Sequence, residues 1–137
     1  MIIYDYRVGD FMTKNVRAVS EDTTVYQAAE LMAKHKIGSV VIMKKKIPVG
    51  IVTDTDIVRK LVAKAKDPKK VLVKDIMTKN VITVSPETTL REASMIMAVN
   101  RVRRLPVIDK KKGLVGIVTE TDLTRVISNS QGLSRIV

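Results

Sequence analysis

The stretch Val49-Gly-Ile-Val-Thr-Asp-Thr-Asp56 occurs a second time, almost unchanged, as Val115-Gly-Ile-Val-Thr-Glu-Thr-Asp122. In both copies an apolar, β-prone run ends at a threonine, and an aspartate follows three residues later. Threonine is a preferred N-cap residue, and a carboxylate in the first helical turn accepts free backbone N–H groups and complements the helix dipole. The stretch therefore predicts a buried strand that passes directly into a helix, twice in one chain.

The repetition extends outward from this stretch over nearly all of the 137 residues. Close to half of the aligned positions are identical, in two blocks: 8–43 with 73–108, and 44–61 with 110–127. The one extra residue, Asp109, falls in a lysine-rich turn. Two copies without a third predict a pair of similar units rather than a solenoid. We expect a first repeat over 8–62, a second over 73–128, and a linker over 63–72.

Each repeat has the same order of predicted elements. A short β-prone piece comes first, at Val16–Val19 and Val81–Val84, and a helix follows it. The pairs Thr24/Gln27 and Thr89/Glu92 have the spacing of a capping box. An apolar run, a lysine-rich turn, the quoted strand and a second helix complete the repeat. The sequence thus predicts an α/β fold of two β-α-β-β-α repeats, facing one another about a pseudo-twofold axis.

The composition excludes several classes of function. The chain has no cysteine, which removes disulfides, thiolate nucleophiles and thiolate metal sites. His35 is the only histidine and is expected at the surface, so neither a histidine metal site nor a catalytic triad can be assembled around it. We therefore expect a protein that is not an enzyme. No apolar run approaches the length of a membrane span, and the N-terminus does not look like a signal peptide, so we expect a cytoplasmic protein.

The formal net charge of +11 favours phosphate-bearing or acidic partners, which leaves nucleic acids, nucleotides and acidic proteins open. The runs Lys44–Lys46 and Lys110–Lys112 lie at expected hairpin tips, where solvated charge is the usual explanation. Aromatic residues do not interleave with these lysines, as they do in single-strand binders. Any nucleic-acid binding should therefore be weak and non-specific.

Arginines concentrate at one place in the second repeat. Arg101, Arg103 and Arg104 lead directly into the apolar run that begins at Leu105, so they are expected at the end of a sheet. A guanidinium fork fits phosphate oxygens. The first repeat has Lys36-Ile-Gly-Ser39 in the same place, without an arginine. The two repeats should therefore differ in their affinity for phosphate.

At these residues the sequence resembles a tandem pair of CBS domains, the cystathionine-β-synthase domain family, also called a Bateman module. The resemblance covers about residues 8–128. It rests on Asp-x-Met-Thr near the start of each repeat, on Leu-Pro-Val-Ile-Asp at 105–109, and on Gly-Ile-Val-Thr-x-x-Asp in both copies. It departs from the family's pattern where the first repeat has Val41 in place of a proline.

The resemblance implies a site for an adenine nucleotide on each repeat, in which the aspartate of Thr-x-x-Asp holds the ribose hydroxyls. The residues implied are Thr53 with Asp56, and Thr119 with Asp122. In the family each site is completed by the other repeat. The Asp56 site would then contain Val81, Ile82, Val102, Arg103 and Arg104. The Asp122 site would contain Val16, Arg17, Ile37, Gly38 and Ser39.

The sequence and the resemblance together predict a regulatory protein that binds AMP, ADP or ATP between its repeats and signals to a regulated partner of unknown identity. S-adenosylmethionine stays open as a ligand. No catalytic cofactor and no metal are expected. We also expect a homodimer, because Ile57, Val58 and Val62 make the second helix more apolar than a lone surface helix requires. Two alternatives are a basic nucleic-acid-binding protein and a structural assembly module without a ligand.

Overall fold

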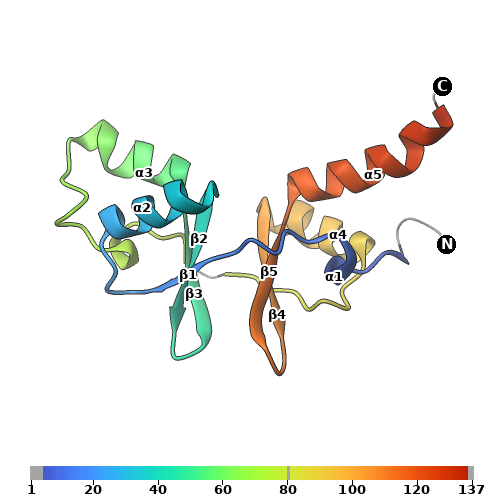
Figure 1. Cartoon of the computed structure of the whole chain (residues 1–137), viewed down its shortest axis with the longest axis horizontal. Helices are drawn as coiled ribbons and strands as arrows, with labels where there is room; N and C mark the ends of the chain where they lie inside the picture. Colours follow the sequence, from blue (N-terminus) through green and yellow to red (C-terminus); the bar gives the residue numbers. More distant parts are fainter. Residues whose placement is uncertain (1–4, 80, 136–137) are drawn as a thin grey trace. The chain divides into compact units, whose positions relative to one another are not determined.

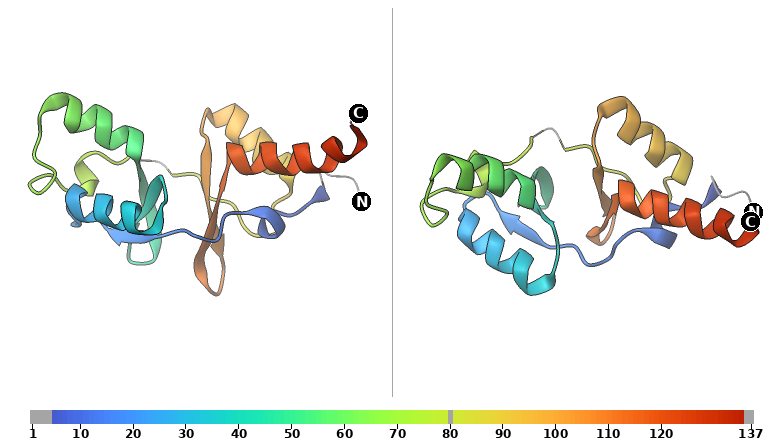
Figure 2. Two further views of the ribbon diagram at one scale, coloured as in Figure 1. Left: turned by 45° about the horizontal axis from the view of Figure 1, so that its top comes forward. Right: turned by 90° about the horizontal axis from the view of Figure 1, so that it is seen from above.

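The structure is a computed structural model that describes residues 5–79 and 81–135. It consists of two compact units. The first-repeat unit is Asn15–Val81, and the second-repeat unit is Met1–Lys14 together with Ile82–Val137. Each unit has its own hydrophobic core, and in each the two long helices lie on the same face of the strands (Figures 1 and 2). This arrangement confirms the predicted α/β class.

The first-repeat unit contains a three-stranded sheet in the order β1-β2-β3. Strand β1 pairs in parallel with β2, and β2 pairs in antiparallel with β3. The elements are β1 (Ala18–Ser20), α2 (Val25–His35), β2 (Ser39–Lys44), β3 (Ile47–Thr53) and α3 (Asp54–Lys60), followed by the 3₁₀ turns η2 (Val62–Lys64) and η3 (Val73–Asp75). The predicted order β-α-β-β-α is therefore confirmed for this repeat.

The second-repeat unit has α4 (Leu90–Asn100), β4 (Arg104–Asp109), β5 (Gly113–Thr119) and α5 (Glu120–Arg135), with the short helix α1 (Val8–Phe11) contributed by the N-terminal segment. Its predicted first strand is reduced to Val84, which bridges Val107 in parallel. Proline explains the loss. In the first repeat the Val41 N–H donates to the Arg17 carbonyl at 3.0 Å, but its counterpart, Pro106, has no N–H to donate.

The predicted helix starts are confirmed in atomic detail. The Thr24 hydroxyl accepts the Gln27 N–H at 3.1 Å while the Gln27 side chain accepts the Thr24 N–H at 3.0 Å. Thr89 and Glu92 repeat this capping box at the start of α4. Each box satisfies two backbone donors that the first helical turn leaves without partners. These caps therefore fix where α2 and α4 begin.

Each repeat gives its opening stretch to the other unit. Thr13, from the start of the first repeat, forms an antiparallel bridge with Ile117 of β5. Thr78, at the same place in the second repeat, bridges Ile51 of β3. Val8 and Val73 are fully buried in the cores of the units that receive them. The repeats visible in the sequence and the compact units of the fold therefore have different boundaries.

Glycines make this exchange possible. A Cβ built on Gly116 would lie 2.6 Å from the sulfur of Met12 and 2.9 Å from the carbonyl oxygen of Thr13. A Cβ on Gly50 would collide with the side chain of Met77. Since real Cβ atoms do not approach other atoms so closely, only glycine lets the exchanged stretch lie against the strand.

Candidate functional site

The predicted site residues gather at one end of the sheet within each unit. In the first-repeat unit Ser39 pairs with Thr53 across β2 and β3, and the Gly38 carbonyl accepts the Asp54 N–H at 3.0 Å. In the second-repeat unit Arg104 pairs with Thr119 in the same way, and the Arg103 carbonyl accepts the Glu120 N–H at 2.9 Å. In the first-repeat unit the start of β2 thus lies beside the start of α3, and in the second-repeat unit the start of β4 lies beside the start of α5.

Asp56 lies at the third position of α3 with part of its carboxylate accessible. Its Oδ2 accepts the Thr53 N–H at 2.9 Å, and the Thr53 hydroxyl accepts the Asp56 N–H at 3.1 Å. Its Oδ1 lies 3.4 Å from the ammonium group of Lys60, and 16% of the side chain is exposed. Lys60 also donates to the Ile76 carbonyl at 2.7 Å, so its ammonium group is shared between this carbonyl and the Asp56 carboxylate. The Asp56 carboxylate therefore keeps acceptor capacity for a ligand.

Asp122, the equivalent residue in α5, is 2% exposed. Its Oδ2 accepts the Thr119 N–H at 2.9 Å, as in the first repeat. In addition, the Thr13 hydroxyl donates to both carboxylate oxygens, at 3.0 and 3.1 Å, and the Arg125 guanidinium lies 2.8 Å from Oδ1. Arg125 also donates to the Phe11 carbonyl at 3.4 Å. The Asp122 carboxylate is therefore used to hold the N-terminal segment.

In the first repeat, the described residues that correspond to Thr13 and Arg125 do not bond to the aspartate. Thr78 corresponds to Thr13, and Arg59 corresponds to Arg125. Both side chains are exposed, and within the described residues neither donates a hydrogen bond to Asp56. The sequence predicts different arginines at the two sites, but it does not predict this difference between the two aspartates, because the Thr-x-x-Asp pattern contains nothing about the segment that packs over the aspartate.

The other predicted site residues are divided between the units. Val16, Arg17, Ile37, Gly38, Ser39 and Val81 lie in the first-repeat unit, and Ile82, Val102, Arg103 and Arg104 lie in the second. Arg103 is exposed and Arg104 is half-buried at the first position of β4. Completion of each aspartate site by the other repeat joins residues of different units and stays a prediction.

Arg17 has a partner that the sequence did not indicate. Its Nη2 lies 3.2 Å from Nδ1 of His35, at the C-terminal end of α2. His35 is half-buried rather than fully at the surface, and Asn15 donates to its backbone carbonyl at 3.1 Å. Loss of hydration lowers the pKa of His35 below its ordinary value of 6.5, and the charges of Arg17 and Lys34 lower it further. The lowered pKa favours the neutral ring, which can accept the arginine hydrogen bond at Nδ1.

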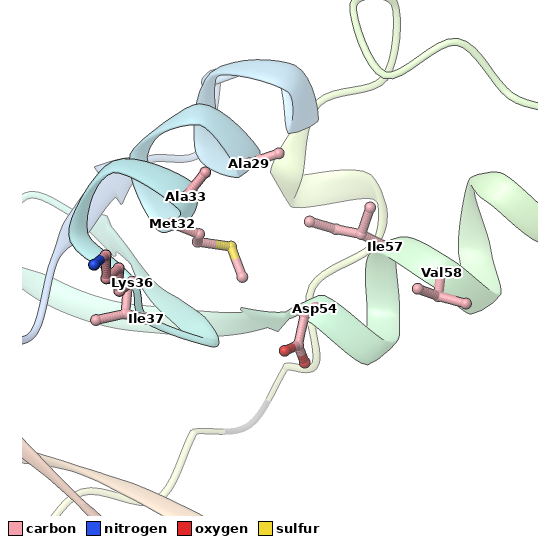
Figure 3. A pocket seen from close by; sticks show the side chains of 8 residues that line it. All are labelled: Ala29, Met32, Ala33, Lys36, Ile37, Asp54, Ile57 and Val58. Carbon is pink, nitrogen blue, oxygen red and sulfur yellow. The ribbon is translucent and has the colours of Figure 1, made fainter.

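The first-repeat unit also has an apolar hollow that the sequence did not indicate. It has a volume of about 440 Å³ and lies between α2 and α3. Met32 of α2 and Ile57 of α3 point toward one another across it, with Val58 at its edge (Figure 3). It is lined by Ala29, Met32, Ala33, Lys36, Ile37, Asp54, Ile57 and Val58. Small residues at 29 and 33 leave this space because alanine does not reach across to α3.

The second-repeat unit has two more polar hollows, near the end of β4. Their volumes are about 480 and 410 Å³, and both contain Ser85, Ile108 and Lys110. Beside them Asp109 accepts the backbone N–H groups of Lys111 and Lys112, at 2.8 and 3.0 Å, and these bonds lower its pKa. Asp109, the extra residue of the second repeat, thus closes the lysine-rich turn.

Residues 5–79 and 81–135 contain no group of three or more metal-ligating side chains. None of their helices is long and apolar enough to cross a membrane. The cytoplasmic location stays a prediction.

The chain is similar to known proteins along most of its length. The family model for the CBS domain matches twice, at residues 8–63 and 73–129. An uncharacterized protein of Methanopyrus kandleri is 40% identical over 120 residues, which are 87% of this chain and 61% of that protein. This chain thus spans less than two thirds of the length of that relative.

Two solved structures have the same fold. A hexameric CBS-CP12 protein from bloom-forming cyanobacteria has a TM-score of 0.78 and 36% identity, covering 86% of this chain and 66% of its own. The CBS domain pair of protein MJ0100, solved with 5′-methylthioadenosine and S-adenosyl-L-methionine, has a TM-score of 0.78 and 28% identity, covering 91% and 98%. With its two matched repeats and these neighbours, the chain belongs to the CBS domain family as a tandem CBS pair.

Proposed function

We propose that this CBS pair is a regulatory protein that binds an adenine nucleotide, AMP, ADP or ATP, mainly at Asp56, and signals its level to a partner protein. The observation that carries the proposal is the state of the Asp56 carboxylate. It is fixed at the start of α3 by the Thr53 N–H at 2.9 Å, and among the described residues its one side-chain partner is the Lys60 ammonium group, 3.4 Å from Oδ1. A fixed carboxylate of this kind can accept both hydroxyls of a ribose.

The neighbouring backbone favours the same ligand. Gly38 and Ser39, which the resemblance assigns to the Asp122 site, lie beside Thr53 in this unit, since Ser39 pairs with Thr53. Because Gly38 has no side chain and Ser39 has a short one, the start of β2 leaves room there. The similar CBS pair that was solved with two adenosine derivatives supports an adenosine ligand for this chain as well. If the sites are completed across the repeats, Arg103 and Arg104 would supply the phosphate contacts at the Asp56 site. Each charged hydrogen bond to phosphate would contribute about 1.5–3 kcal/mol.

Asp122 is proposed as the weaker site. A ribose at Asp122 would have to replace the Thr13 hydroxyl or the Arg125 guanidinium, both of which already bond to the carboxylate. Exchanging one charged hydrogen bond for another yields little net free energy. We therefore expect one strong site in each chain.

Calorimetric titration of the protein with AMP, ADP, ATP and S-adenosylmethionine tests the proposal. We expect at least one of the three adenine nucleotides to bind with a micromolar or lower Kd and a stoichiometry near one per chain. Absence of heat with all four ligands, at protein concentrations above 100 μM, would leave the structural assembly module as the better description.

The hollow between α2 and α3 supports a second proposal, that two copies of the chain associate through this face. Val58 is 56% exposed at its edge, and apolar side chains line most of it. The similar CBS-CP12 protein is described as hexameric, so this fold does take part in assemblies. Exposed apolar surface around a groove is typical of an interface.

Light scattering at micromolar concentration tests the association. Wild-type protein should have the mass of two chains or more, and Val58→Glu should have the mass of one. Ile47→Glu is the matched control, because Ile47 is also exposed but lies at the hairpin between β2 and β3, outside the hollow. A monomeric wild type would contradict this proposal and leave nucleotide binding untouched.

A further inference from the structure

Positive charge is unevenly distributed over the chain. Residues 15–81 hold 14 of the 25 Lys and Arg residues and 7 of the 14 Asp and Glu residues. Within this unit the excess is concentrated after α3, where residues 59–79 contain eight basic side chains and two acidic ones. Four of these lysines, Lys64, Lys66, Lys69 and Lys70, form what we call the basic strap.

The backbone of the basic strap is anchored at several points. Lys64 and Lys66 both donate their N–H groups to the Leu61 carbonyl at 3.0 Å, and Leu61 is buried in the core. Farther along, the Pro68 carbonyl accepts the Tyr26 N–H at 3.0 Å, which joins the strap to the first turn of α2. Figures 1 and 2 show this segment at the end of the unit that is farthest from strands β1–β3. The lysines therefore occupy defined places on one edge of the unit.

The charge of the basic strap is not neutralised within the described residues. The two ion pairs nearby use Lys60 with Asp56 and Lys74 with Asp22, which lie on either side of it. No ion pair of Lys64, Lys66, Lys69 or Lys70 is found in this part of the chain, and all four residues are exposed. Asp67 is bonded to the Lys69 N–H at 2.9 Å. A row of lysines without ion pairs attracts ligands that carry several closely spaced negative charges, and a polyanion is such a ligand.

One aromatic residue lies beside the basic strap, although the sequence places it far away. Tyr26 is 40% exposed, and the Lys69 ammonium lies 4.9 Å from the centre of its ring. Lys69 thus lies over the ring, while Lys64, Lys66 and Lys70 have no ion pair in the described chain. Single-strand binders combine aromatic rings with such lysines, because bases stack on the rings while phosphates contact the ammonium groups. An acidic peptide has no base to stack, and a duplex keeps its bases covered. The pairing of Tyr26 with Lys69 therefore favours a single strand.

We propose that Tyr26 and the basic strap bind single-stranded nucleic acid without sequence preference, as a function separate from nucleotide binding at Asp56. The strand would place its phosphates along Lys64, Lys66 and Lys70 and stack a base near Tyr26. Its affinity should be modest and strongly dependent on salt, since lysines act as point charges without the fork of arginine. None of the eight residues that line the hollow between α2 and α3 is part of this surface.

Fluorescence anisotropy with a labelled 20-nucleotide oligo(U) tests the proposal. The strap variant Lys64→Gln/Lys66→Gln/Lys70→Gln is compared with the hairpin variant Lys44→Gln/Lys45→Gln/Lys46→Gln, which loses the same charge from the same unit. The strap variant should lose about tenfold or more in affinity, and its slope of log K against log salt should be shallower by about 2, at roughly 0.7 for each lost phosphate contact. The hairpin variant should lose less than about threefold.

Two further arms make the assignment specific. Tyr26→Leu should weaken oligo(U) several-fold and leave binding of polyglutamate unchanged, and a 20-base-pair duplex should bind less tightly than oligo(U). Equal losses in the strap and hairpin variants would overturn the proposal by showing an effect of net charge alone. Polyglutamate or duplex binding as tight as oligo(U) would overturn it in favour of an acidic protein or a duplex partner. AMP titration of the strap variant, expected to match wild type, reports separately on the Asp56 site.

Discussion

The hydroxyl of Thr13 donates to both carboxylate oxygens of Asp122, at 3.0 and 3.1 Å, and so joins the start of the first repeat to the last helix of the second. Arg125 completes the arrangement at 2.8 Å. Because Asp122 is almost fully buried, each of these donors offsets the cost of removing a carboxylate from water. Asp122 is thus a structural clamp, whereas Asp56, which lacks these two donors, is the residue that we propose binds a ligand.

Thr13→Val should destabilise the protein, and Thr78→Val should not. Valine keeps the shape of threonine but removes the donor, which leaves the buried Asp122 carboxylate with one partner fewer. We expect the free energy of unfolding to fall by about 1–3 kcal/mol for Thr13→Val, and by less than about 0.5 kcal/mol for Thr78→Val, whose hydroxyl does not bond to Asp56. Urea denaturation followed by circular dichroism measures both. Equal losses would show that the Asp122 clamp contributes nothing specific.

The pKa of His35 provides a second test, by NMR titration of its ring protons. We expect a pKa below 6.5, because the ring is partly desolvated and lies beside Arg17 and Lys34. Arg17→Gln should raise the pKa toward 6.5 without reaching it, since the desolvation remains. Because the pKa is lower in the folded state than in the unfolded state, the unfolded state binds a proton more readily. The free energy of unfolding should therefore decline as the pH falls from 6.5 to the folded-state pKa, and His35 should cause no further decline below that pH. A pKa above 6.5 in the wild type would contradict the contact with Arg17.

Substitution of Arg104 tests whether phosphate recognition is separate from ribose recognition. If the Asp56 site is completed by the second repeat, Arg104→Gln should weaken AMP by about ten- to a hundredfold and adenosine by less than about threefold, because adenosine has no phosphate. Arg101→Gln is the matched control, an exposed arginine that lies outside the predicted sites. Calorimetric or competition titrations give both affinities. Equal weakening of AMP and adenosine would remove the phosphate role from Arg104.

The α/β class, the order of elements and the helix caps could be predicted from the sequence because each depends on local signals. Periodic apolar residues and Thr-x-x-Gln, Thr-x-x-Glu or Thr-x-x-Asp spacings determine where helices begin. The first strand of the second repeat was predicted too long, since the proline that removes its hydrogen-bond donor, Pro106, lies on the partner strand rather than on the strand itself.

The difference between the two aspartates could not be predicted, because it depends on contacts between distant segments. Thr13 and Thr78 occupy the same place in the repeat, and the sequence does not indicate that only one of them bonds to the aspartate it faces. The same holds for Tyr26 and Lys69, whose contact depends on how the segment after α3 returns to the start of α2. Local patterns thus predict the candidate residues, but the packing of distant segments determines which candidate side chains already have partners within the chain.

The most direct test of the account is a calorimetric titration of AMP into the wild type, Asp56→Asn and Asp122→Asn, with melting temperatures measured alongside. Asparagine keeps an acceptor for the helix cap and removes the charge. We predict that Asp56→Asn weakens the tightest binding event by about tenfold or more with little change in melting temperature. Asp122→Asn should preserve that event and lower the melting temperature. Loss of the tight event in Asp122→Asn, with its retention in Asp56→Asn, would contradict the assignment of the main site to Asp56.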